Sequence, residues 1–339
     1  MMDDVLLRVE NLSTHFVTPR GVVRAVDGVS FDVAAGETFG LVGESGCGKS
    51  VTCRSILRLA PSPPARLGGR VMFEGHDLLA LRPRDLRAVR GARIAMIFQD
   101  PMTALNPVMR VGDQIAETLH EHQSIGRRQA RGRVLELMSL VGIPAPRERV
   151  DDYPHQFSGG MRQRVVIAVA LACDPRVLLA DEPTTALDVT IQDQILKLLL
   201  RLQQTMGMSI VLVTHDLGIV AQTCHRVAVM YAGKIVEQAD TASLLAAPRH
   251  PYTRGLLDSL PNVRERTRYL RPISGAPPDL AEPPSGCRFH PRCPLAADAC
   301  MCTEPPLIQV APGHFSACFY HEKMIEPLAT GHSGLAVST

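Results

Sequence analysis

Residues 43–50 read Gly43-Glu44-Ser45-Gly46-Cys47-Gly48-Lys49-Ser50, and this stretch decides the fold. Residues 38–42 before it have the composition of a buried strand, and a helical pattern follows Lys49 to about Leu59. Glycines permit backbone turns that direct N–H groups at phosphate oxygens, and the N-terminus of a helix adds a partial positive charge. A strand, a glycine-rich loop and a helix in this order predict a phosphate-binding loop. The alternative is a glycine-rich turn that matches by chance.

The predicted loop supplies most of the nucleotide contacts. We expect Lys49 to reach the β- and γ-phosphates of ATP and Ser50 to ligate Mg²⁺. The thiol of Cys47 would lie near bound phosphate, so a thiol reagent should inactivate the protein and ATP should protect it, unless Cys47 is simply a tolerated small side chain. The residues assigned to this contact are Gly43, Glu44, Ser45, Gly46, Cys47, Gly48, Lys49, Ser50 and Val51.

Length, charge and hydropathy restrict the class of protein. A chain of 339 residues has room for one large domain and an appendage, and 36 Lys and Arg against 34 Asp and Glu give no field that calls for nucleic acid. The first residues are acidic and no long apolar run follows them, unlike a secretory signal. The longest apolar run, residues 165–173, is about half of the ~20 residues that cross a bilayer. We therefore expect a cytosolic protein whose membrane passage, if it serves transport, comes from other chains.

Polar side chains follow three β-rich runs at residues 93–98, 177–180 and 209–213. In open α/β sheets the site is built at the carboxyl ends of such strands. We expect Asp181 to hold Mg²⁺, Glu182 to orient or deprotonate the attacking water, His215 to contact the γ-phosphate and water, and Gln99 to sense Mg²⁺ or water. The alternatives are a solvated charge for Glu182, a structural role for His215 and a polar strand cap for Gln99.

The region between the first two of these strands is mostly helical. Val134, Leu137, Met138 and Val141 recur at the spacing of a packed helix face. We therefore expect a helical subdomain, at about residues 102–172, inserted into the sheet. Short β-rich runs at 6–9 and 29–33 precede the phosphate loop.

Residues 157–164 read Phe-Ser-Gly-Gly-Met-Arg-Gln-Arg and precede a helix that we expect to run to about Ala172. Ser158, Gly159 and Gly160 would present a hydroxyl and bare amides at a positive helix end. Because the chain already has its own phosphate loop, we predict that this segment contacts ATP held by a partner subunit. As an isolated helix cap it would carry no function.

Together these motifs resemble the ATP-binding cassette (ABC) ATPases over roughly residues 5–240. The resemblance implies an α/β fold with a RecA-like P-loop NTPase core, an N-terminal antiparallel β subdomain and an inserted helical subdomain. It identifies 43–50 as the Walker A loop, 158–161 as the signature, Asp181 and Glu182 as the Walker B end, and 186–188, with Asp188, as the D-loop. It also implies Gln99 as the Q-loop glutamine, His215 as the switch histidine and an aromatic side chain that stacks on adenine, assigned to Phe16 with Phe31 as the alternative.

The segments 98–107, 153–156 and 250–253 narrow the resemblance to ATPases of dipeptide and oligopeptide importers. This subgroup implies a peripheral subunit at the cytoplasmic face of the membrane, with a second ATPase subunit (a paralogue rather than a copy), two membrane permeases and an extracytoplasmic substrate-binding protein. We expect an ATPase domain at 1–248, a Cys-rich C-terminal extension at 249–326 and a flexible tail at 327–339.

Cysteines crowd the C-terminal extension, and some members of the subgroup carry a 4Fe-4S cluster there. By that resemblance the ligands are Cys287, Cys293, Cys300 and Cys318, with Cys302 as a substitute for Cys300. Thiolates suit iron-sulfur clusters or zinc, but zinc usually prefers ligand pairs two to four residues apart. Zinc and unliganded thiols remain the alternatives.

Two other functions compete with transport. A soluble ABC ATPase of DNA repair or translation would normally show a second cassette or a long coiled-coil insertion, and neither is visible in the sequence. An iron-sulfur redox or sensing module with a degenerate nucleotide site is the other rival, against which Glu182 and His215 argue.

Overall fold

The computed structural model describes residues 5–19, 21–185, 187–259 and 273–324, and it divides into two compact units. One unit is built mainly from residues 80–213, and the other combines 6–32, 38–79 and the chain from Thr214 onward. The expected tail at 327–339 lies outside the described residues. Within the described part of the chain, no helix is long and apolar enough to cross a membrane.

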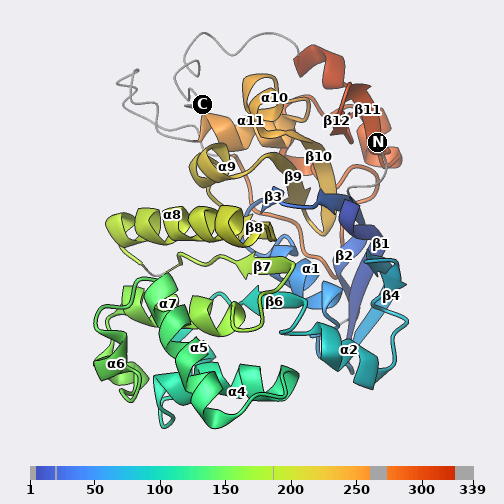
Figure 1. Ribbon diagram of the computed structural model, residues 1–339. Coiled ribbons are helices and arrows are strands. Elements are labelled where there is room, and N and C mark those ends of the chain that lie inside the picture. Colours follow the sequence, from blue (N-terminus) through green and yellow to red (C-terminus); the bar gives the residue numbers. More distant parts are fainter. Residues whose placement is uncertain (1–4, 20, 186, 260–272, 325–339) are drawn as a thin grey trace. The chain divides into compact units, whose positions relative to one another are not determined.

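The first unit joins a parallel sheet to a group of helices, drawn in green in Figure 1. Strand β7 pairs in parallel with β6 and with β8, and β7 and β8 are buried along their whole length. Helix α7 packs on α4, α5, α8 and β6. The elements are α2 (Pro83–Val89), β6 (Ile94–Ile97), α3 (Pro101–Ala104), α4 (Val111–His122), α5 (Arg127–Leu140), α6 (Pro146–Arg149), η1 (Pro154–Gln156), α7 (Gly159–Ala170), β7 (Val177–Asp181), α8 (Val189–Met206) and β8 (Ser209–Thr214).

The second unit contains an antiparallel sheet and a mixed sheet. In the first, β1 and β4 pair antiparallel, as do β4 and β5. In the second, β3 and β9 pair in parallel and β10 lies antiparallel to β9. The elements before the extension are β1 (Val5–Thr18), β2 (Gly21–Ala34), β3 (Thr38–Val42), α1 (Lys49–Ile56), β4 (Ala65–Phe73), β5 (His76–Asp77), α9 (Leu217–Thr223), β9 (Arg226–Tyr231), β10 (Lys234–Asp240) and α10 (Thr241–Ala246).

The C-terminal extension is more regular than its proline content indicates. Strand β12 pairs antiparallel with β10, with Ser316 opposite Glu237, and β11 adds to β12. A backbone ladder therefore orders this part of the extension. Its elements are α11 (Pro251–Asp258), η2 (His290–Arg292), α12 (Asp298–Cys302), β11 (Ile308–Ala311), β12 (His314–Ser316) and η3 (His321–Met324).

Local signals explain several helix ends. Ser158 and Asp188 accept hydrogen bonds from the first turns of α7 and α8, and Gly207 ends α8 in the left-handed region at φ 64°. The predicted face of α5 is confirmed, since Val134, Leu137, Met138 and the cap residue Val141 are buried. Helix α1 ends at Ile56, a few residues before the predicted end, because the backbone of Arg58 turns left-handed at φ 51°.

Candidate functional site

The phosphate loop lies between β3 and α1 in the second unit. The side chain of Lys49 is only 4% exposed, and its Nζ donates to the carbonyls of Gly43 at 2.7 Å and Glu44 at 2.9 Å. Gly48 has φ 108°, and a Cβ there would lie 2.1 Å from the carbonyl oxygen of Ala25. Only glycine fits at this position. The loop therefore has the tight backbone path and the inward lysine that a phosphate site requires.

Cys47 does not behave as an accessible thiol. It is buried, its Sγ lies 3.8 Å from the Lys49 ammonium, and burial raises its pKa even though the lysine acts in the opposite direction. A buried thiol with a raised pKa is a poor nucleophile. The structure thus argues against rapid inactivation by thiol reagents and for the alternative of a small tolerated side chain.

Glu44 contacts the C-terminal extension through its backbone N–H and through its carboxylate. Its backbone N–H donates to the hydroxyl of Tyr252, and its carboxylate pairs with the guanidinium of Arg292. Sequence analysis placed Glu44 among the nucleotide contacts but missed both partners, because neither is near it in the chain.

The first unit brings Gln99 and Glu182 together. Asp181 is fully buried at the end of β7, and Glu182 follows it with a left-handed backbone at φ 46°. The amide of Gln99 donates to Oε2 of Glu182 at 3.0 Å, and the hydroxyl of Thr185 donates to the same oxygen at 2.8 Å. These donors fix the orientation of the carboxylate. Thr185 was missed by sequence analysis, although its position three residues after Glu182 is the spacing of a local turn.

His215 directly follows β8 and is exposed. The next residue, Asp216, accepts a hydrogen bond from Gly218 N–H at 2.7 Å and thereby starts α9. His215 belongs to the second unit with the phosphate loop, whereas Gln99, Asp181 and Glu182 belong to the first. Each unit therefore contributes part of the predicted catalytic set.

The signature and the D-loop residue occupy helix N-termini. Ser158 is exposed and accepts from Met161 N–H at 3.4 Å, while Asp188 accepts from Ile191 N–H at 3.0 Å. A Cβ on Gly160 would lie 2.7 Å from the Cγ2 of Ile191. Close packing of α7 on α8 is thus a second reason for glycine, in addition to the bare amide that the sequence suggested.

The structure distinguishes the two candidate adenine-stacking residues. Phe31 is buried and stacks on Phe39 with ring centroids 5.0 Å apart, so its face is already covered. Phe16 lies opposite Ala65 in the antiparallel sheet and is half-buried. Of the two, Phe16 keeps a ring face accessible.

Four cysteines line one small pocket in the extension. Burial first, and then the nearby Cys287 and Cys300, raise the pKa of Cys293 to about 11; burial and the other three thiols raise the pKa of Cys318 to about 12. Among the described residues, however, no group of three or more His, Cys, Asp or Glu side chains is arranged so that it could hold a metal ion. The residues around the pocket include Cys287, Cys293, Cys300, Cys318, His250, Phe289, Leu295 and Pro305.

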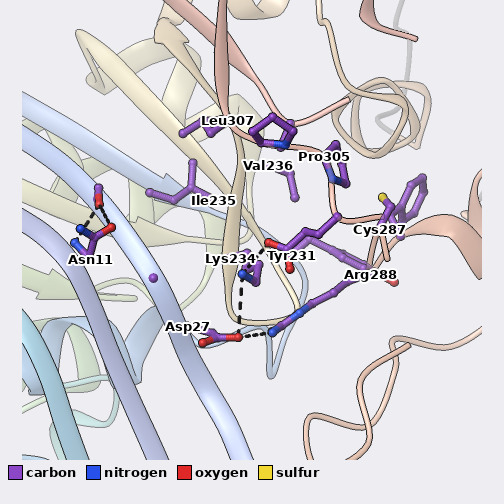
Figure 2. Close-up of a pocket in the computed structure, with 16 residues that line it drawn as sticks. Asn11, Asp27, Tyr231, Lys234, Ile235, Val236, Cys287, Arg288, Pro305 and Leu307 are labelled. Atoms are coloured by element: carbon purple, nitrogen blue, oxygen red, sulfur yellow. Dashed lines mark hydrogen bonds and ion pairs between the residues drawn. The ribbon is translucent and has the colours of Figure 1, made fainter. Parts of the chain in front are cut away.

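A larger pocket of about 320 Å³ lies where the extension meets β2 and β10. Figure 2 shows Lys234 and Arg288 directed at Asp27 from different segments. Burial by itself disfavours the charged carboxylate, but the charges of Arg288 and Lys234 outweigh it and hold the pKa of Asp27 below its usual value. Lys234 also pairs with Glu304 at 2.6 Å, so both acidic groups of this pocket have basic partners.

Comparison with known proteins agrees with these features. Residues 26–185 match the family described as ABC transporter, and residues 236–300 match the family described as oligopeptide/dipeptide transporter, C-terminal region. A probable peptide ABC transporter ATP-binding protein of Sinorhizobium fredii is 53% identical over 95% of this chain and 97% of its own length. The dipeptide transport ATP-binding protein DppD of Bacillus subtilis is 52% identical over 95% of this chain and 96% of its own length.

The solved structures point to the same family. An ATP-binding cassette, solved as a dimer in a post-hydrolysis state with ADP and Pi, superposes with a TM-score of 0.62 at 26% identity. The match covers 69% of this chain and 98% of that chain. With the phosphate loop, the glutamate after β7 and relatives matched over nearly their whole length, the chain belongs to the ATP-binding proteins of peptide-type ABC transporters.

Proposed function

We propose that this chain is the ATP-hydrolysing subunit of an ABC importer for dipeptides, oligopeptides or related small solutes. The observation that carries the proposal is the Glu182 carboxylate, held by Gln99 and Thr185 at the end of a buried strand. The near full-length similarity to dipeptide and peptide transport proteins supports the substrate class.

The roles of the residues follow from their positions. Lys49 and the loop amides bind the phosphates of ATP, and Glu182 and His215 orient the attacking water. Gln99, which donates a hydrogen bond to Glu182, senses Mg²⁺ or water in the site. Ser50 and Asp181 are the groups that would hold Mg²⁺, which would neutralise charge on the phosphates. A hydroxyl at a helix start and a carboxylate at a buried strand end fit that ion.

The hydrolytic site is proposed to require a second ATPase subunit. Ser158 and Gly160 lie at the exposed N-terminus of α7, and this chain already has a phosphate loop of its own. We infer that Ser158, Gly159 and Gly160 contact ATP on the partner subunit, a paralogue rather than a copy, and that Asp188 lies beside the same interface. Closure of the two subunits on ATP would move two membrane permeases at the cytoplasmic face, which receive cargo from a substrate-binding protein.

A 4Fe-4S cluster on Cys287, Cys293, Cys300 and Cys318 is also proposed. Four thiols line one pocket and are the soft donors that such a cluster takes, which supports the proposal, although the described side chains are not grouped around a metal position. Binding of the cluster would require these thiols to lose their protons, a cost that the raised pKa values of Cys293 and Cys318 increase and that bonds to iron would have to outweigh. Such a cluster would cross-link the segments of the extension. Iron and acid-labile sulfide in equal amounts support it, whereas zinc or no metal would contradict it.

Uptake of a labelled dipeptide into proteoliposomes that hold the assembled transporter tests the function. We expect ATP-dependent uptake with the native chain and none with Lys49→Ala, which removes the phosphate-binding ammonium while the membrane subunits stay present. A transporter that hydrolyses ATP but takes up no peptide would contradict the substrate class. A chain that hydrolyses ATP at full rate without any membrane subunit or partner would instead favour a soluble ABC ATPase.

A further inference from the structure

We propose that Arg292 and Tyr252 of the C-terminal extension are positioning residues for the phosphate loop, which they hold through Glu44. The inference rests on the proposed function, since it concerns how the loop binds ATP. It assigns the extension a role in nucleotide affinity, separate from any metal at its cysteines.

The contact between Arg292 and Glu44 is bidentate. Nη1 of Arg292 donates to Oε2 of Glu44 at 2.6 Å, and Nη2 donates to Oε1 at 2.9 Å. The arginine side chain is 4% exposed and the glutamate 27%, so solvent screens this pair little. Paired charge-assisted hydrogen bonds of this geometry are among the strongest polar contacts in proteins.

Tyr252 holds the backbone of the same loop residue. Its hydroxyl accepts the N–H of Glu44 at 2.8 Å, and Tyr252 is fully buried in the first turn of α11. Burial raises the pKa of Tyr252, so the hydroxyl stays neutral. The amide of Glu44 is thereby directed at the extension, which fixes where the loop turns toward Ser45 and Gly46.

Aromatic packing holds the two positioning residues. The rings of Tyr231, Tyr252 and Phe289 lie 4.6 to 5.4 Å apart by centroids, and the guanidinium of Arg292 lies 5.8 Å from the ring centroid of Tyr231. Nε of Arg292 also donates to the carbonyl of Ser274 at 3.0 Å. The arginine therefore has one defined orientation, as a positioning residue needs.

A second contact, made from outside the extension, holds the other end of the loop. The N–H of Gly233, in the turn between β9 and β10, donates to the carbonyl of Cys47 at 2.8 Å. Arg288 of the extension holds that turn by donating to the carbonyl of Ala232 at 2.5 Å. Arg288 also pairs with Asp27, as Figure 2 shows. Both ends of the segment 44–47 are thus fixed by contacts to the second unit's own C-terminal half.

These contacts have two consequences for ATP. A carboxylate at the second residue of a phosphate loop would repel the triphosphate, and Arg292 neutralises it and keeps it turned away. A loop held at both ends also loses less conformational entropy when its N–H groups bind phosphate. Removal of Arg292 should therefore weaken ATP binding without changing Glu182, which sits in the other unit.

Titration of the full-length chain with Mg-ATP by calorimetry, and ATP hydrolysis by the assembled transporter, test the inference. We expect Arg292→Ala to raise both the Kd and the KM for ATP about tenfold to a hundredfold, with kcat near that of the native chain. Arg292→Lys should restore part of the affinity, because it keeps the charge but not the bidentate geometry. Tyr252→Phe should weaken binding less, since it removes one neutral hydrogen bond.

Glu44→Gln and the double variant decide whether Arg292 acts through Glu44. Glu44→Gln leaves every residue of the extension in place but removes the carboxylate through which Arg292 holds the loop. We expect it to weaken ATP binding less than Arg292→Ala, because the repulsion between Glu44 and the triphosphate is removed as well, and this loss supports the inference even if Arg292→Ala disturbs the fold. The double variant should be no weaker than the worse single variant. Glu304→Ala is the matched control, because it removes an ion pair of the extension that ends on Lys234 rather than on the loop.

The outcomes separate this inference from the proposed function. If the native chain binds ATP and both Arg292→Ala and Glu44→Gln keep a native-like Kd and KM, the inference is overturned but the proposed function is not. Failure of the native chain to bind ATP would overturn the proposed function itself. An equal loss in Glu304→Ala would show a general effect of the extension and would also overturn the specific role of Arg292.

Discussion

The phosphate loop and the signature segment each precede a helix N-terminus, but they are stabilised in different ways. Ser158 caps α7 through a residue three positions away. Glu44, in the phosphate loop, bonds to residues 208 and 248 positions away, and α1 has no side-chain cap. The signature is thus a local structure on an exposed helix end, whereas the phosphate loop depends on contacts made by the far end of the chain.

The largest expected effect on ATPase activity comes from Ser158, compared with a helix cap that has no assigned role in the ATP site. Asp240 caps α10 in the same manner, accepting from Ser243 N–H at 3.1 Å. Ser158→Ala should lower the kcat of the assembled transporter about 10²- to 10³-fold, the usual effect of removing one donor from a site. Asp240→Ala should cost only about 1 kcal/mol of stability. Equal ATPase rates for the two variants would show that Ser158 acts only as a structural helix cap.

A second comparison uses glycines from the two regions. Gly48→Ala would place a Cβ against a backbone carbonyl and force a strained φ, so ATP affinity of the purified chain should fall about 10²-fold. Gly160→Ala meets only the side chain of Ile191, which can turn, and should leave that affinity unchanged while lowering the unfolding temperature. Calorimetry and thermal unfolding measure both. Loss of ATP affinity in Gly160→Ala would show that the signature contributes to this chain's own nucleotide.

The smallest effect is a pH dependence of stability at the start of the extension. Burial lowers the pKa of His250 to about 3, and its Nδ1 accepts Tyr252 N–H at 3.1 Å, so the folded protein keeps it neutral. Because unfolded histidine titrates near 6.5, the unfolded state binds more protons between pH 6.5 and 3. His250 therefore contributes stability above pH 6.5 that falls by about 1.4 kcal/mol per unit as the pH decreases toward 3.

The variant His250→Asn checks this expectation. Asparagine retains an acceptor for the helix cap but does not titrate. Chemical unfolding at a series of pH values should show a shallower loss of stability in acid than the native chain shows. Parallel curves would contradict the role of His250 in the acid sensitivity.

The contrast between local and long-range contacts also explains which features could be predicted from the sequence. Strand β3, the loop and helix α1 follow from local composition, and so do the N-caps Ser158 and Asp188, because each depends on neighbours within a few residues. The pairing of β12 with β10 and the contacts of Glu44 with Arg292 and Tyr252 join segments far apart in the chain. No periodicity or motif encodes such pairs. Of the two hydrogen-bond donors to Glu182, Gln99 was identified as a site residue by its strand end, although its bond to Glu182 was not predicted, and Thr185 was not identified.

The cysteine cluster was predictable from the sequence only in part. Its four members were named from spacing within a resemblance, and the structure places all four around one pocket. Their burial and their mutual effect on pKa follow from the fold of the extension and could not be read from spacing alone. The identity of the ligand remains part of the proposal.

Turnover by Glu182→Gln in the assembled transporter tests the central claim most directly. The account predicts that this variant binds Mg-ATP as tightly as the native chain, because the phosphate loop is untouched, and hydrolyses it about 10²- to 10³-fold more slowly. Glutamine keeps the shape and accepts from Thr185, so a loss of rate reports the carboxylate itself. Hydrolysis at the native rate would contradict the assignment of Glu182 as the group that activates water.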